Sequence, residues 1–419
     1  MSSDWSSVEF QKLFLVPLRN GLTRPKAVRG SGVKMINMGE LFANERIGNL
    51  PMDRVPVTDK ELSVNAVYPG DLLFARQSLV LSGAGKCSLF IEDKEPVVFE
   101  SHLIRCRLDR AKADGGFYSY YFRSTSGRAK IESIVEQVSA AGIRGSDLAK
   151  LEVAHPPLTT QKAIAHILGT LDDKIELNRK TNETLETMAK ALFKSWFVDF
   201  DPVRAKAEGR PTGLPSEISD LFPDSFEDSE LGEIPSGWEV YSLDEVIELA
   251  YGKPLKEEQR NGGSYPVFGS NGVVGSHNEY LVEAPGIVIG RKGNPGTVEW
   301  SGKNFYPIDT TFFVVKKKGD LGMRFLFYCL KNQNLSNLSA DSAVPGLNRN
   351  HAYMNIQLLP PVEVASAFER HLEVIFNRKA FLAEEINTLG ATRDALIPKL
   401  ISGEIRISDT EKMLEEVGI

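Results

Sequence analysis

The sequence predicts an α+β protein that is built twice, each copy consisting of a β-rich globular unit followed by a long helix. The first observation is a repeat: GIRGSDLAKLEVAHPPL (142–158) aligns with GLNRNHAYMNIQLLPPV (346–362) at a fixed offset of 204 residues,. The second is a pair of heptad-patterned segments, and the third is a series of short Val-, Ile- and aromatic-rich runs between turn residues. A chain of 419 residues is long enough for two or three domains,.

The repeat extends upstream into the globular units. DLLFAR (71–76) resembles GIVIGR (286–291) at an offset of 215, so the first copy carries an extra 11 residues between these two anchors. Gly21 and Gly252 stand at turns near the start of the two copies,. The stretch YPVFGSNGVVGSHNEYLVEAPGIVIGRKGNPGTVEW (265–300) alternates such runs with Gly, Asn and Pro, which favours strands with close loops,.

Both helical segments carry a heptad repeat in the same frame. In each segment two lines of residues recur every seven positions, and eight of the ten positions are apolar,. The predicted seam comprises Ile164, Leu168, Leu171, Ile175, Asn178, Asn182, Leu185 and Leu192 in the first helix, and Phe368, Leu372, Ile375, Leu382, Ile386, Leu389 and Leu396 in the second.

For one such helix, packing on its own globular unit explains the stripe equally well. Two copies in one register favour a pair of helices packed on each other. Asn178 and Asn182 then fix the register or, together with Lys379 and Arg393, mark solvent-exposed gaps in the seam,. A frame of about 33 residues gives a rod of roughly 50 Å. If the pair is antiparallel, a pseudo-twofold axis relates the two units, which suits reading a target in two separated parts.

Composition narrows the class of protein. Three cysteines without a CxxC motif suggest neither a disulfide framework nor a zinc knuckle,. No apolar run approaches a membrane span and the N-terminus lacks a signal-peptide pattern, so we expect a cytoplasmic protein. The net charge of −7 is local, because residues 211–236 alone carry seven acidic and no basic side chains. This segment is expected to be a solvated connector.

The loops of the globular units hold side chains suited to DNA. Arginine and lysine contact guanine edges or phosphate, asparagine contacts adenine, and glycine lets a backbone approach closely. A solvated surface charge or a turn residue explains any one of these positions, so the prediction concerns the group. The group comprises Ser270, Asn271, Arg291, Lys292, Asn294, Asn348 and Arg349 in the second copy and Arg76, Gln77 and Arg144 at the matching places in the first.

At this point nearly the whole chain resembles the specificity subunits of type I restriction-modification systems. The resemblance is carried by PPLTTQKAIAHILGTLDDKIELNRKTNETLETMAKALFKSWFVDFDPV (156–203), LGEIPSGWEVYSL (231–243), YPVFGSNGVVG with IGRKGNPG, and IDTTFFV (308–314). It implies two target-recognition domains in a pseudo-twofold arrangement, each reading one part of a bipartite DNA sequence. It also implies that the two helices separating them form an antiparallel coiled coil.

The resemblance further implies partners that carry the chemistry. Two modification subunits, which bind S-adenosylmethionine and methylate adenine, dock on the helices, and restriction subunits join to give an ATP- and Mg-dependent translocating endonuclease. In ALFKSWFVDFDPV (191–203), Phe193, Phe197 and Phe200 lie off the seam and need another covering surface. Either the base of a recognition domain or a modification subunit covers them, and docking to the subunit is favoured. Gly390 and Pro398, where the first helix has Glu186 and Lys194, put equivalence of the two docking ends in doubt.

The chain itself shows no catalytic pattern. Its Pro-Pro pairs read HPPL and LPPV, which lack the Asn or Asp and the aromatic ring of an adenine methyltransferase motif. SGAGKC (82–87) lacks the first glycine of a phosphate-binding loop and reads as a surface turn,. No metal set is evident, and we expect a non-catalytic subunit without a cofactor of its own. Two alternatives remain, a coiled-coil scaffold and a divergent DNA methyltransferase.

The resemblance and the repeat together divide the chain into six segments. These are a first target-recognition domain (1–157), a central spacer helix (158–200), an acidic linker (201–236), a second target-recognition domain (237–361), a C-terminal spacer helix (362–405) and a tail (406–419).

Overall fold

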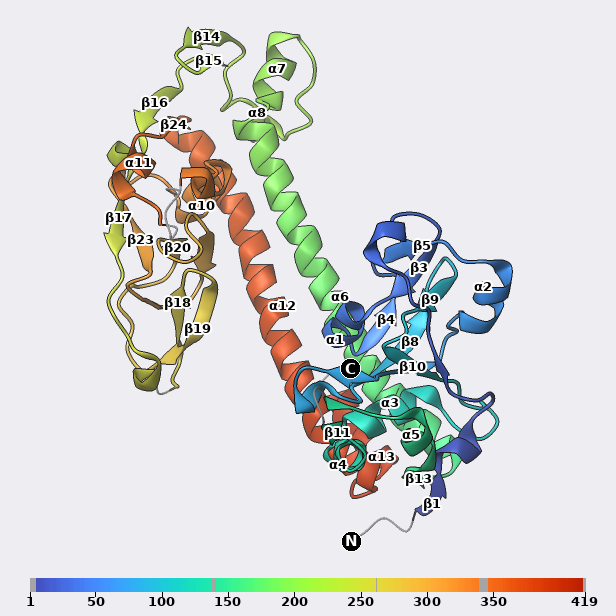
Figure 1. The fold of residues 1–419 in the computed structure, drawn as a ribbon. Helices are drawn as coiled ribbons and strands as arrows, with labels where there is room; N and C mark the ends of the chain where they lie inside the picture. The colour runs from blue at the N-terminus through green and yellow to red at the C-terminus, as the bar shows by residue number, and fades with distance from the viewer. Residues whose placement is uncertain (1–4, 138–140, 261, 339–345, 417–419) are drawn as a thin grey trace. The chain divides into compact units, whose positions relative to one another are not determined.

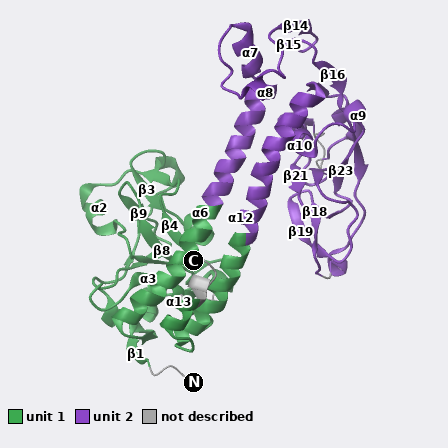
Figure 2. Ribbon diagram, turned by 180° about the vertical axis from the view of Figure 1, so that it is seen from behind, with its two compact units in different colours: residues 1–178, 385–419 green, residues 179–384 purple. Residues whose placement is uncertain are grey.

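The computed structural model describes residues 5–137, 141–260, 262–338 and 346–416. The chain divides into two compact units, residues 1–178 with 385–419 (unit 1) and residues 179–384 (unit 2), shown in Figure 2. Both units mix helices and sheets, as the sequence predicts. Each unit is assembled from both halves of the chain, because both long helices are divided between them.

Unit 1 contains a five-stranded sheet and a three-stranded sheet. The five-stranded sheet has the order β2 (Arg19–Asn20), β10 (Leu103–Cys106), β6 (Leu72–Ala75), β8 (Cys87–Glu92) and β4 (Arg46–Gly48). In the other sheet β3 (Val33–Ile36) lies between β5 (Asp53–Val55) and β9 (Val97–Phe99) and is parallel to β9.

Smaller pairings and five short helices complete the globular part of unit 1. β1 (Ser6–Glu9) pairs with β13 (Glu152–His155), and β12 (Ala141–Gly142) lies between β11 (Glu136–Gln137) and β7 (Gln77–Ser78). The helices are α1 (Met38–Ala43), α2 (Asp59–Asn65), α3 (Gly115–Arg123), α4 (Thr125–Glu132) and α5 (Gly145–Lys150).

Unit 2 has a four-stranded sheet of order β17 (Ile247–Tyr251), β23 (Thr311–Lys316), β20 (Gly286–Gly290) and β21 (Val298–Ser301). Its second sheet has β18 (Tyr265–Gly269) between β19 (Gly272–His277) and β22 (Tyr306–Pro307), and β16 (Glu239–Ser242) pairs with β24 (Ile356–Leu359). The helices of its globular part are α9 (Leu243–Val246), α10 (Met323–Asn332) and α11 (Arg349–Tyr353).

The sequence repeat is also a repeat of topology. β13 and β24 are separated by the predicted offset of 204 residues, and each pairs antiparallel with the first strand of its copy. The order β2-β10-β6-β8 matches β17-β23-β20-β21, and both smaller sheets contain a central parallel pair. The pairing of Gln77 with Gly142 is matched by the bridge between Lys292 and Gly346. The predicted duplication is therefore confirmed for these strands, whereas β4 and β11 of unit 1 have no counterpart among the described strands of unit 2.

Two long helices, α6 (Leu158–Phe197) and α12 (Val362–Ser402), run antiparallel within each unit (Figure 1). In unit 1 Arg393 Nη1 donates to Asp172 Oδ1 at 2.6 Å, and in unit 2 Lys379 Nζ donates to Glu186 Oε2 at 2.5 Å. A residue early in α6 therefore meets one late in α12, and the reverse. The two ion pairs are two heptads apart on both helices, so one register accounts for both.

Most of the predicted seam positions are buried. Asn182, Leu185, Leu192, Ile375 and Ile386 are half-buried, and the other ten are at most 8% exposed. The same residues also enter the cores of the globular parts: Leu168 and Leu171 join the core of unit 1, and Phe368 and Leu372 join that of unit 2. The seam residues of each helix therefore pack both on the globular part of a unit and on the other long helix.

Three of the four polar seam residues, Asn178, Lys379 and Arg393, are paired, whereas the Asn182 side-chain oxygen is buried and makes no hydrogen bond within the described residues. Asn178 is 3% exposed and its amide donates to Glu385 at 3.0 Å. Burial lowers the pKa of Arg393, but hydrogen bonds to Asp172 and Asp394 outweigh this effect and raise the pKa above its usual value. Burial raises the pKa of Glu186, but the hydrogen bond from Lys379 and the charges of Lys379, Lys331 and Lys190 together outweigh it, so the carboxyl stays charged to lower pH than usual.

The acidic segment after α6 is folded, which differs from the expected solvated connector. It contains α7 (Asp201–Ala207), α8 (Ser216–Ser219) and a hairpin of β14 (Phe226–Ser229) and β15 (Gly232–Pro235). Val203, Phe222 and Ile234 are 0%, 2% and 4% exposed and belong to the core of unit 2. The sequence did not indicate that this segment is folded, because its buried apolar residues are few and widely spaced among acidic side chains.

The remaining described segment is α13 (Ile407–Glu416), which follows α12 in unit 1. Among the described residues, no helix combines the length and the apolar character that crossing a membrane requires. Cys87, Cys106 and Cys329 are buried free thiols, and burial raises the pKa of each.

Replacing Arg393 by methionine should destabilise unit 1. The substitution leaves the Asp172 carboxylate, 9% exposed, with Arg123 at 3.7 Å as its remaining cation. Removing one partner of a buried ion pair is strongly destabilising, so we expect a loss of about 2–3 kcal/mol in the free energy of unfolding, measured by urea titration. Lys112→Met breaks the exposed pair with Asp109 and should cost less than about 1 kcal/mol,. Equal losses in the two variants would contradict a structural role for the buried pair.

Candidate nucleic-acid interface

Two arginines converge on Tyr251 in unit 2. Arg291 follows the buried strand β20, and Arg349 begins α11. Their guanidinium carbons lie 5.0 and 5.1 Å from the centre of the Tyr251 ring, which is 49% exposed. Arg291 Nη1 also donates to the carbonyl oxygen of Asp309 at 2.9 Å. Stacking on an aromatic face holds a guanidinium in place while leaving other N–H donors for a ligand.

The backbone holds this loop against the segment that precedes α11. The N–H groups of Arg291 and Lys292 both donate to the carbonyl oxygen of Thr310, at 2.9 and 3.1 Å, and the N–H of Leu347 donates to Arg291 O at 2.9 Å. The Lys292 side chain is exposed and, among the described residues, makes no hydrogen bond or ion pair. Asn348 has a local structural role as the N-cap of α11, since its side chain accepts the N–H of Asn350 at 2.9 Å.

The turn between β18 and β19 meets the same loop. Ser270 lies beside Gly293, and its carbonyl oxygen accepts the Thr297 hydroxyl at 2.8 Å. Asn271 and Asn294 are exposed. Unit 2 therefore brings together all seven of its predicted DNA-contacting residues on two neighbouring loops and the start of α11.

Unit 1 presents a smaller group. Arg76 and Gln77 follow β6 and are both exposed, and the N–H of Ile143 donates to Arg76 O at 2.9 Å. This contact places Arg144 next to them in the fold. Arg144 Nη2 lies 2.6 Å from Glu136 Oε2, so part of its charge is compensated. The Arg76 side chain makes no hydrogen bond or ion pair within the described part of the chain.

Sequence reasoning missed Tyr251, although it singled out the glycine that follows. A Cβ at Gly252 would lie 2.1 Å from the carbonyl oxygen of Ile308, and one at Gly21 would lie 2.0 Å from that of Phe99. Both positions therefore require glycine because the backbones are in close contact. The position of an aromatic residue next to such a glycine could have indicated Tyr251. Its two arginine partners could not be inferred, because they lie 40 and 98 residues further along the chain.

The structure does not support the expected docking role of the three phenylalanines. Phe193 and Phe200 are 6% and 9% exposed, and Phe197 is half-buried. Phe197 packs edge-on against Phe325 and Phe368, at ring-centre distances of 5.0 and 4.9 Å. The chain's own unit 2 covers Phe193 and Phe200 and part of Phe197, in line with the alternative that a recognition domain covers them. Their burial partner could not be inferred because it is formed by distant residues.

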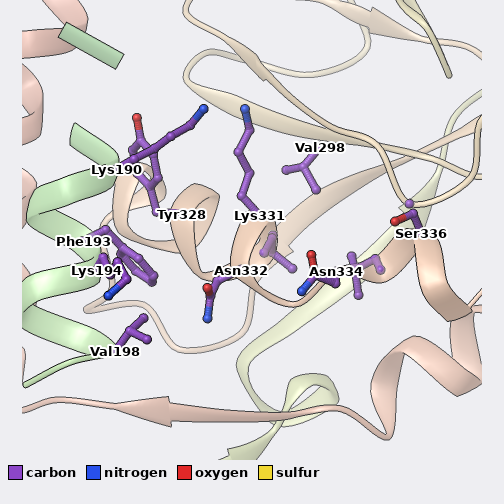
Figure 3. A pocket seen from close by; sticks show the side chains of 13 residues that line it. Lys190, Phe193, Lys194, Val198, Val298, Tyr328, Lys331, Asn332, Asn334 and Ser336 are labelled. Atoms are coloured by element: carbon purple, nitrogen blue, oxygen red, sulfur yellow. The ribbon is translucent and has the colours of Figure 1, made fainter. Parts of the chain in front are cut away.

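Phe193 also lines a recess of about 480 Å³ in unit 2, shown in Figure 3. Lys190, Lys194 and Lys331 stand around it, but each lies within 4.0 Å of a carboxylate oxygen, of Glu186 or Asp199. Burial lowers the pKa of Lys331. Because these cations already have anionic partners, the recess is a less suitable anion site than the Tyr251 loops.

The side chains gathered on these loops are hydrogen-bond donors and acceptors and cations. Within the described ranges, no group of three or more His, Cys, Asp or Glu side chains is placed to hold a metal ion. Such a surface is suited to bind nucleic acid, because its cations can contact phosphates and its hydrogen-bonding side chains can contact base edges. Fold and loops together define a class of internally duplicated proteins with two non-identical recognition units and an antiparallel helix pair.

The chain belongs to the type I restriction modification DNA specificity domain family, whose model matches residues 3–187 and 235–351. The two matched regions include the globular part of unit 1 and most of that of unit 2, up to α11. The predicted resemblance is thereby confirmed, and it extends over the loops that carry Arg76 and Arg291.

Named relatives belong to the same family. The chain is 28% identical over 323 residues to the HindI specificity subunit of Haemophilus influenzae, covering 62% of this chain and 70% of the relative. It is 25% identical over 395 residues to the MjaVIII specificity subunit of Methanocaldococcus jannaschii, covering 85% and 83%. A crystal structure of the S subunit from M. genitalium has the same fold, with a TM-score of 0.62 at 17% identity over 95% and 96% of the two chains.

Truncating Phe193 should destabilise the isolated chain. Phe193→Ala removes a ring that packs on Tyr328 and Phe368, at ring-centre distances of 5.9 and 6.0 Å. Large-to-small core substitutions of this kind cost about 3 kcal/mol, to be measured by urea unfolding of the purified chain. Phe381 on α12 is 56% exposed, and Phe381→Ala is the matched control, with less than about 0.5 kcal/mol expected,. If the Phe193 variant were as stable as the control, the result would favour a modification subunit, and not unit 2, as the surface that covers this ring.

Proposed function

We propose that this chain is the sequence-reading subunit of a type I restriction-modification complex and recognises a bipartite, asymmetric DNA target. The family match over both units is the observation that carries the proposal. Each unit presents equivalent loops after β6 and β20, so each is suited to reading one part of the target. The loops differ in sequence, Arg76 and Gln77 in one and Arg291 and Lys292 in the other, and the two half-targets should differ accordingly,.

The proposal assigns the chemistry to partner subunits. Two modification subunits, binding S-adenosylmethionine, would methylate adenine in the target, and restriction subunits would use ATP and Mg²⁺. This chain would act in the cytoplasm as a non-catalytic part of that complex. Its helices expose apolar side chains, including Met188 at 55% and Val374 at 71% exposure, which are suited to contact these partners,.

Exchanging residues 237–361 for the same region of a relative should change one half of the target only. Footprinting and methylation mapping of the complex with modification subunits would locate both halves before and after the exchange. Because β16 and β24 pair within the exchanged region, the strands at its two ends move together. A change in both halves, or in neither, would contradict the two-reader architecture, and a complex that protects no defined sequence would refute the proposed function.

Lys292 should contribute a phosphate or base-edge contact. We expect Lys292→Ala to weaken binding of the footprinted duplex about tenfold and to reduce the slope of log K against log salt by about one, because one released counterion is lost. Lys303 is also exposed in unit 2 but pairs with Glu384 at 3.0 Å on α12, so Lys303→Ala is the matched control. Equal salt slopes for wild type and the Lys292 variant would show that Lys292 is not part of the DNA interface.

A further inference from the structure

A loop of unit 1 exposes three consecutive apolar side chains. Leu79, Val80 and Leu81 are 98%, 60% and 50% exposed. Single exposed apolar residues are common on protein surfaces, but a continuous run of them is unusual and marks a binding site or an aggregation risk. Among the described residues, no large hydrophobic side chain is more exposed than Leu79.

The loop is held in place by the chain around it. The Ser78 hydroxyl oxygen accepts the N–H of Val80 at 3.2 Å, and the N–H of Gly83 donates to Val80 O at 3.0 Å. From α4, Arg128 Nη2 donates to the carbonyl oxygen of Leu81 at 3.3 Å. Unit 1 therefore presents the apolar tip on a braced turn, so a ligand need not order the loop first.

The base of this loop is buried, which differs from the expected surface turn at SGAGKC. Gly85 packs beneath Ile131 and Ile143, and the Lys86 ammonium donates to the carbonyl oxygen of Phe42 at 2.8 Å. Lys86 is therefore occupied with a structural contact. These contacts tether the end of the loop that lies opposite Arg76 and Gln77.

The loop continues directly from the unit 1 residues assigned to DNA. Residues 76–86 contain two cations and no acidic residue. Arg128 and Arg144 lie nearby, although each is paired with a glutamate, Glu132 and Glu136. Within the described residues, Arg76 is thus the cation next to the tip that has no hydrogen-bond or ion-pair partner. An apolar tip beside such a cation favours nucleic acid over an acidic or purely apolar protein surface.

The second copy has a different loop at the matching place. After Arg291 and Lys292 the chain reads GNPG, which is polar and short, and Pro295 is buried. Of these two matching loops, the one in unit 1 carries an apolar tip and the one in unit 2 does not. An apolar tip on one of two equivalent loops would make the contacts to one half-target partly apolar, whereas those to the other half-target would be polar.

We propose that Leu79 makes an apolar contact with the bases of duplex DNA, in the half of the target that unit 1 reads. Leucine side chains contact bases either at the thymine methyl group in the major groove or as a wedge at an unstacked base step. Both contacts have the same chemistry and depend on the local base sequence. This inference rests on the proposed function, and it adds a specificity-determining residue outside the polar group.

The test uses the full chain assembled with its modification subunits. Leu79→Ala should weaken binding to the footprinted duplex about tenfold, with an unchanged salt slope because an apolar contact releases no counterions. On a duplex whose unit 1 half is scrambled, the variant and the wild type should bind equally. Leu79→Met should restore most of the affinity. Leu231, 45% exposed in the β14–β15 hairpin, supplies the control Leu231→Ala, which should bind as the wild type does.

Two modified duplexes separate the forms of contact. Replacing thymine by uracil in the unit 1 half should abolish the difference between wild type and Leu79→Ala if the contact is to a methyl group. If the side chain is a wedge, 2-aminopurine at the contacted step should fluoresce more strongly with the wild type than with the variant. A positive result in either duplex supports the inference, and the absence of both effects would count against it.

Equal affinity of Leu79→Ala and wild type for the footprinted duplex would overturn the inference and leave the proposed function intact. The same conclusion follows if the variant loses as much affinity for the scrambled duplex as for the footprinted one. It also follows if the variant fails to assemble with modification subunits, because the tip would then contact a partner protein. A wild-type complex that cannot distinguish the footprinted from the scrambled duplex would overturn both the inference and the proposed function.

Discussion

The antiparallel contact between α6 and α12 is the interaction on which both units depend. The core of unit 1 contains Leu171 from α6 and Leu389 from α12, and the core of unit 2 contains Trp196 and Phe368 from the same two helices. Neither core is complete with residues of one sequence repeat. The boundaries of the repeat and of the compact units therefore do not coincide.

Ion pairing makes this helix contact specific. At the equivalent of Asp172 and Arg393, the other half of the chain has Phe376 and Ala189, and at the equivalent of Glu186 and Lys379 it has Gly390 and Ile175. Each of these ion pairs thus occurs once, and a second copy of either helix would not supply the matching charges. Buried polar groups of this kind can specify register and partner at some cost in stability.

Heptad spacing predicted the two long helices and their buried seam, and the repeat predicted two β-rich units built on the same plan. They could not predict the charge partners, because Asp172 and Glu186 each follow a seam residue by one position and carry no periodic signal of their own. Phe222 and Ile234 were likewise hidden in an acidic segment, and the covering of Phe193 required residues more than a hundred positions away. Local patterns predict secondary structure and one buried face, whereas the choice of partner is a tertiary property.

For the candidate interface, the repeat identified equivalent loops but not their environment. The matching backbone pairs at Gln77 and Lys292 follow directly from the alignment. The stacking of Arg291 and Arg349 on Tyr251 does not, because three separate strands and loops have to meet before the ring acquires its neighbours.

The ion pair between Asp172 and Arg393 also joins residues that are 221 positions apart in the chain. At translation rates of about 5–20 residues per second, α6 waits on the order of tens of seconds before its partner helix leaves the ribosome. During that interval Leu168 and Leu171 lack their neighbours from α12, and the nascent chain carries an uncovered apolar stripe. The last long helix to be synthesised completes both units at once, so a ribosome that stops early releases two unfinished cores.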